Sequence, residues 1–88
     1  FAFPGFAKSA TDLLLEHDVA AIGVDTLSLD PGNSADFAVH NSWLPAGRYG
    51  IEGLANLEEL PVLGATIVVG APKHRGGTGG PARVLALV

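Results

Sequence analysis

The 88-residue sequence contains no cysteine and no methionine, and only 16% of its residues are charged. The absence of cysteine excludes disulfides and thiolate metal sites, and it fits the cytoplasmic location that we expect. Because no methionine is present, we expect the chain to be processed or to be the ordered part of a longer protein. No apolar run approaches the roughly 20 residues of a membrane-spanning helix, so we expect no membrane association.

The few charges that are present argue against two classes of partner. Five basic residues are scattered among nine acidic ones, and the net charge is −4. Nucleic acids and anionic membranes attract clustered basic side chains, so we expect neither as a partner. The chain is also 48% hydrophobic, while a domain of this size buries only about 60–65% of its unfolded surface. We therefore expect part of its apolar surface to be covered by more chain or by another subunit.

Apolar patterning predicts strands that alternate with short helices, which is typical of an α/β fold. Apolar spacings of three and four predict helices over 8–17 and 36–44. A continuous apolar run predicts a strand over 19–24 that is buried on both faces, as in a parallel sheet. A second buried strand is predicted over 65–70. The remaining predicted elements are a strand over 48–53, a turn or short helix over 56–60 and an apolar strand over 82–88.

Two residues between Val39 and Leu60 combine apolar surroundings with metal-binding chemistry, namely His40 and Glu52. Burying either side chain without a partner is costly. The turn at 45–47 can bring the helix that carries His40 back over the strand that carries Glu52. An imidazole nitrogen and a carboxylate suit zinc or manganese.

The residues alone favour a more ordinary interpretation of this pair. His40 would be half-buried, and Glu52 would be satisfied by backbone donors or by Arg48. A metal site would need at least one or two further protein ligands. Four residues are candidates without diagnostic spacing: Asp25, Asp30, Asp36 and His74.

Two other segments contain residues that could form a binding or catalytic site, but the sequence evidence for a site in either is weak. The glycine-rich loop 76–80 lacks the Gly-Lys-Ser/Thr ending of a phosphate-binding loop and precedes a strand, so a flexible turn is the better interpretation. Arg83 beyond it is able to clamp a carboxylate or to pair with an acidic residue. Asp25 and Ser28 follow a predicted strand, where they would line a cleft or cap loop backbone groups. No histidine is spaced to activate Ser28, so a serine hydrolase is unsupported.

Four segments together resemble the C-terminal half of the cyclase family of metal-dependent hydrolases, which includes bacterial kynurenine formamidases and isatin hydrolases. The segments are FPGF before a helix, AIGVDTLSLD, VHNSWLPAGRYGIEGLANLEELP, and GGTGGPAR before an apolar strand. The resemblance implies a swivelling β/β/α fold of which residues 1–88 form the C-terminal part, with the N-terminal half of the domain absent. It also implies assembly into a homodimer or homotetramer.

The same resemblance implies hydrolysis of an amide bond in a small N-formyl or cyclic amide substrate, with one or two Zn2+ or Mn2+ ions activating water. His40 and Glu52 match the family's C-terminal metal ligands. Its other ligands belong to a motif like His-x-Gly-Thr-His-x-Asp, which this sequence lacks.

The family's general-base histidine matches neither His17 nor His74, so we expect no catalytic residue in this chain and no activity from it in isolation. The alternatives are a non-enzymatic interaction domain and a family member that has lost catalysis.

Overall fold

The computed structural model describes residues 2–88, so Phe1 lies outside the described residues. The chain divides into two compact units, Phe1–Ala55 and Asn56–Val88. Each unit contains its own two-stranded sheet, so the four strands among residues 2–88 form two sheets and not one larger sheet. Among the described residues, none of the helices has the length and apolar character that crossing a bilayer requires.

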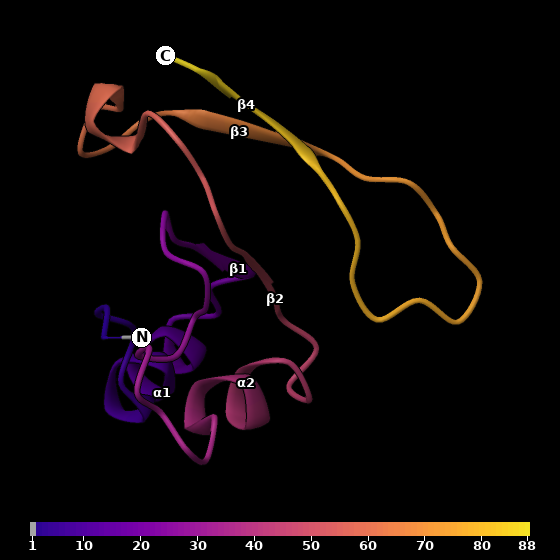
Figure 1. The fold of residues 1–88 in the computed structure, drawn as a ribbon. Coiled ribbons are helices and arrows are strands. Elements are labelled where there is room, and N and C mark those ends of the chain that lie inside the picture. Colours follow the sequence, from indigo (N-terminus) through magenta and orange to yellow (C-terminus); the bar gives the residue numbers. More distant parts are fainter. Residues whose placement is uncertain (1) are drawn as a thin grey trace. The chain divides into compact units, whose positions relative to one another are not determined.

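The first unit pairs two short parallel strands with two helices (Figure 1). In chain order its elements are α1 (Lys8–Glu16), β1 (Ala21–Gly23), α2 (Ala38–Trp43) and β2 (Tyr49–Ile51). Strand β1 runs parallel to β2, with Ala21 opposite Tyr49. The predicted parallel pairing is confirmed, but β1 is three residues long and only its central Ile22 is buried, so the predicted burial on both faces is wrong.

Helix α1 begins and ends as local sequence chemistry predicts. Ala7 occupies the N-cap position and provides no side-chain hydrogen bond, as expected for a residue without a capping hydroxyl. Lys8 and Asp12 form an exposed ion pair of 2.9 Å across one turn. After the helix, Asp18 adopts a left-handed conformation with φ 55°, which aspartate tolerates better than most residues.

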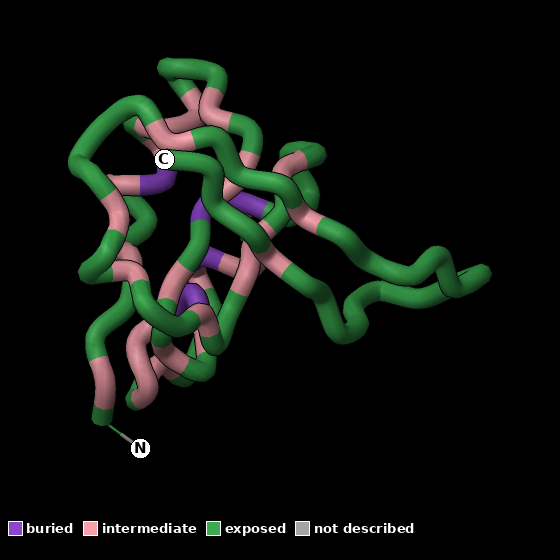
Figure 2. The backbone as a smooth tube through the Cα atoms, turned by 90° about the horizontal axis from the view of Figure 1, so that it is seen from above, coloured by how far each residue is buried: buried purple, intermediate pink, exposed green. Residues whose placement is uncertain are grey.

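A small apolar core lies between α2 and the parallel strands. Its buried members are Ile22, Leu29, Val39 and Trp43. Figure 2 marks the buried positions in purple, and all those among residues 2–88 belong to the first unit. The indole N–H of Trp43 donates a 2.8 Å hydrogen bond to the carbonyl oxygen of Tyr49, which ties α2 directly to β2.

The second unit consists of a 3-10 turn and an antiparallel hairpin. Its elements are η1 (Leu57–Glu59), β3 (Thr66–Gly70) and β4 (Arg83–Leu87), and Thr66 pairs with Leu87. The prediction of a buried strand over 65–70 is wrong, because Ile67 and Val68 of β3 are exposed and so is Leu85 of β4. Two strands provide no second layer, so the apolar composition of this segment does not produce burial within the unit.

We expect Trp43→Phe to destabilise the protein because it keeps the buried ring but removes the bond between α2 and β2. Loss of this partly buried hydrogen bond should cost about 0.5–1.5 kcal/mol. Urea unfolding of the intact protein measures this loss. Tyr49→Phe, which alters an exposed side chain on the same strand, is the control and should leave the midpoint nearly unchanged.

Candidate metal centre

The predicted meeting of His40 and Glu52 is found in the structure. His40 lies in the middle of α2, and Glu52 follows β2 directly. The turn between them brings His40 Nε2 to 3.3 Å from Glu52 Oε2. Both side chains are partly open to solvent, with 29% and 38% of their surface exposed. Neither side chain is therefore enclosed in the core.

Asp30 supports His40 from the opposite side of the imidazole ring. Its carboxylate is 1% exposed and lies 2.7 Å from His40 Nδ1. The backbone N–H groups of Val39 and His40 donate to the same carboxylate at 2.8 and 3.0 Å. Asp30 therefore satisfies the start of α2 and the imidazole together, although it stands nine residues before the first of these donors.

The hydrogen bonds to Asp30 determine the protonation of this buried carboxyl group. Burial raises its pKa, because a charged group loses favourable hydration. The His40 ring and the two backbone N–H groups lower it, and together they prevail, so the pKa of Asp30 lies below its ordinary value. Asp30 is consequently an anion at neutral pH and acts as a hydrogen-bond acceptor for the imidazole.

An ionised Asp30 assigns the two nitrogens of His40 to different roles. Nδ1 carries the proton and donates it to Asp30 Oδ2, since the carboxylate can only accept. In the neutral ring Nε2 then presents a lone pair toward Glu52 Oε2. Two lone pairs that face one another repel unless a proton or a metal cation lies between them.

Glu52 is held in place by a backbone group next to Asp30. The N–H of Leu29 donates to Glu52 Oε2 at 3.0 Å, so the ordinary interpretation of a glutamate satisfied by backbone is partly confirmed. Arg48 forms its ion pair with Asp18 instead, at 2.6 Å. Adjacent residues of one loop therefore orient the two candidate ligands: Asp30 orients His40, and Leu29 orients Glu52.

Phe37 packs against the imidazole from the helix start. Its ring lies 5.9 Å from that of His40 at an angle of 87°, an edge-to-face contact. Phe37 has φ 50° and ψ 48°, a left-handed conformation that is unfavourable for a bulky residue. Such backbone strain is found more often at functional sites than elsewhere.

The distances fit two ligands of one divalent cation. Ligand atoms about 2.0–2.1 Å from a tetrahedral zinc ion lie about 3.3–3.4 Å apart, and the observed separation of Nε2 from Oε2 is 3.3 Å. A charge-assisted hydrogen bond is shorter, about 2.7–2.9 Å, which matches the Asp30 contact and not the Glu52 contact. A carboxylate behind a ligating histidine is also the usual arrangement at metal sites.

The ligand set is nevertheless incomplete in the part of the chain that the structure describes, where no group of three or more His, Asp or Glu side chains is placed to hold a metal. Asp30, a candidate ligand from the sequence, is engaged with His40 Nδ1. Asp25 is exposed, and Asp36 accepts a hydrogen bond from the Ser34 hydroxyl. His74 belongs to the second unit.

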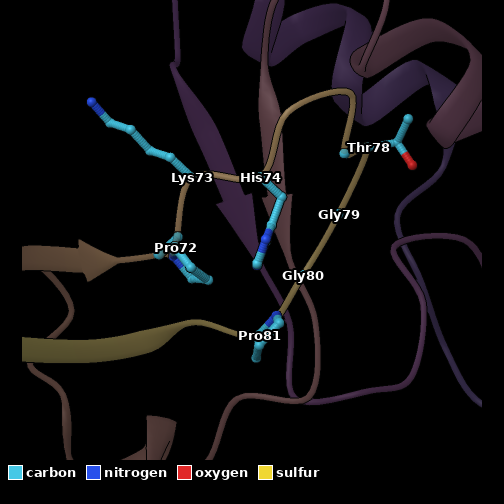
Figure 3. Close-up of a pocket in the computed structure, with 9 residues that line it drawn as sticks. Pro72, Lys73, His74, Thr78, Gly79, Gly80 and Pro81 are labelled. Carbon is cyan, nitrogen blue, oxygen red and sulfur yellow. The ribbon is translucent and has the colours of Figure 1, made fainter.

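The remaining sequence candidates have ordinary local roles or open surroundings. Ser28 Oγ accepts the N–H of Asp30 at 3.2 Å, so its role as a loop cap is confirmed. His74 lines an open hollow formed by residues 71–74 and 77–81 of the loop between β3 and β4 (Figure 3). Arg83 is exposed on β4 opposite Gly70.

Comparison with known proteins relates the chain to a hydrolase. No family model matches the sequence. The chain is similar to isatin hydrolase of Roseibium aggregatum, with 34% identity over 89 residues. The matched region includes 97% of this chain but only 34% of the relative, so the chain spans about one third of that protein's length.

We expect the contribution of Asp30 to stability to disappear in acid. Because its folded pKa is lowered, the ionised carboxylate stabilises the fold fully above the unfolded pKa of about 3.9. That stabilisation is lost as the pH falls through the folded pKa. In urea unfolding of the metal-free intact protein, Asp30→Asn should be less stable than wild type at pH 6, and the difference should shrink below about pH 4. A difference that stays constant down to pH 2 would contradict the assignment.

Proposed function

We propose that this chain is part of a metal-dependent hydrolase that cleaves an amide C–N bond. The observation that carries the proposal is the 3.3 Å separation of His40 Nε2 and Glu52 Oε2, with Asp30 hydrogen-bonded behind the imidazole. The similarity to isatin hydrolase supports it independently of the geometry. Isatin is a cyclic amide, so we propose a small cyclic amide or N-formyl compound as the substrate class.

His40 and Glu52 would provide two ligands to Zn2+ or Mn2+. A bound divalent ion polarises a scissile carbonyl group and activates water for attack on it. His40 would bind through Nε2, because Nδ1 is committed to Asp30. Of the two Glu52 oxygens, Oε2 holds the only hydrogen bond that residues 2–88 offer this carboxylate, which leaves Oε1 available for the same ion or a second one.

The proposal requires at least one more ligand, because catalytic zinc normally has three from protein. We propose that this ligand and the general base come from the remainder of the protein or from another subunit of a homodimer or homotetramer. On that basis these residues alone would bind metal weakly and would not turn over substrate.

One observation favours a role in assembly as a second candidate function. Four apolar side chains of the hairpin are 46–61% exposed, namely Ile67, Val68, Leu85 and Leu87. Exposed apolar patches often mark protein interfaces. A non-enzymatic interaction domain, or a relative without catalysis, would use this surface while His40 and Glu52 served structure.

We expect His40→Ala in the intact protein to abolish stoichiometric metal binding and to lower amide hydrolysis by more than about 100-fold, because a ligand is lost. Elemental analysis after dialysis measures the metal, and circular dichroism should show an unchanged fold. His17→Ala removes an exposed histidine just after α1 and is the matched control. Stoichiometric metal and full rate in His40→Ala would refute the proposal.

Glu52→Gln should also lose metal, because an amide is a much weaker ligand than a carboxylate of the same size. The side-chain oxygen of glutamine can still accept the N–H of Leu29, so the loop should stay in place. Glu59→Gln, at the end of η1, is the matched control and should retain wild-type metal content. Equal metal content in the two variants would exclude Glu52 as a ligand.

A further inference from the structure

We propose that Asp30 is a positioning residue that makes Nε2 of His40 the metal-binding nitrogen. This inference rests on the proposed function, since it concerns how the chain prepares one ligand of that site. Asp30 would touch neither metal nor substrate. Its carboxylate would instead hold the ring in one tautomer and one orientation.

The orientation follows from two contacts made by the same histidine. The backbone N–H and the ring Nδ1 of His40 both meet Oδ2 of Asp30, at 3.0 and 2.7 Å. Main chain and ring converge on one oxygen atom, which fixes the side-chain rotamer. A flipped ring would present a C–H group to the carboxylate and forfeit the shorter contact.

Further hydrogen bonds hold Asp30 itself in place. Its carboxylate also accepts the N–H of Val39 at 2.8 Å, and its own N–H donates to Ser28 Oγ. With 1% of its side chain exposed, water cannot replace it as the acceptor for Nδ1. The His40 side chain is 29% exposed and Glu52, on the side of Nε2, is 38% exposed, so the pair is less enclosed than the Asp30 carboxylate.

The tautomer follows from the chemistry of the acceptor. An ionised carboxylate offers only lone pairs, so Nδ1 carries a ring proton, and the tautomer with that proton alone leaves the lone pair of Nε2 for a cation. An asparagine at position 30 keeps the size of the side chain but offers an NH2 group. That group can donate to Nδ1, which moves the ring proton to Nε2 and blocks the ligand.

The test compares Zn2+ affinity in three forms of the intact protein by competition with a chromogenic chelator at one pH. We expect Asp30→Asn to bind about 10–100-fold more weakly than wild type, the usual effect of removing a carboxylate behind a ligating histidine. Asp12→Asn is the matched control: it makes the same change in an exposed carboxylate of α1 that pairs with Lys8, so it should stay within about threefold of wild type.

A spectroscopic measurement on the wild-type protein removes dependence on how Asp30→Asn folds. In 15N-histidine NMR of the Zn2+-loaded protein, His40 should show a protonated Nδ1 and a metal-bound Nε2. A metal-bound Nδ1 would overturn the inference, and so would wild-type affinity in a folded Asp30→Asn protein. If His40→Ala retains its metal, the proposed function fails. If His40→Ala loses metal while Asp30→Asn keeps wild-type affinity, only the role of Asp30 fails.

Discussion

The buried carboxylate of Asp30 is the interaction on which the first unit depends. It accepts two backbone N–H groups at the start of α2 and the ring of His40. A six-residue helix whose N-cap residue provides no side-chain hydrogen bond would be marginal alone. One anion therefore stabilises the helix and orients the imidazole that the helix carries, so the fold and the candidate site share the same contacts.

Leu29, the residue before Asp30, connects the same loop to β2. Leu29 is 1% exposed and its side chain fills the space over Gly50, where an added Cβ would lie within 3.1 Å of Leu29 Cγ. The same residue donates its N–H to Glu52. Packing of one leucine against a glycine of β2 thus fixes the backbone donor that holds the second candidate ligand. Trp43 completes the connection through its bond to Tyr49.

Local sequence chemistry predicted the helices and strands of this chain and a parallel sheet at the first strand, because apolar periodicity and turn residues act over a few positions; it did not predict which strand pairs with it. The turn at 45–47 also predicted that His40 and Glu52 lie close together, and the 3.3 Å contact confirms this prediction. Local sequence chemistry identified Asp30 only as a candidate ligand, since a loop carboxylate ten residues before its histidine has no characteristic spacing. Burial of 65–70 was predicted wrongly because an apolar strand does not reveal whether a second layer covers it.

Under the proposed function, the incomplete ligand set and the exposed apolar side chains of the hairpin have the same explanation. The candidate centre lacks ligands among residues 2–88, and the β3–β4 hairpin exposes apolar side chains on strands that have one neighbour each. An isolated two-stranded hairpin is marginally stable in water, so under the proposed function further protein would cover these apolar residues. Because the similar hydrolase is about three times as long as the matched region, a larger protein would supply both the cover and the missing ligands. A shared proton or a shared cation between His40 Nε2 and Glu52 Oε2 would each account for their 3.3 Å spacing, and only the cation also accounts for the similarity to a hydrolase under the proposed function.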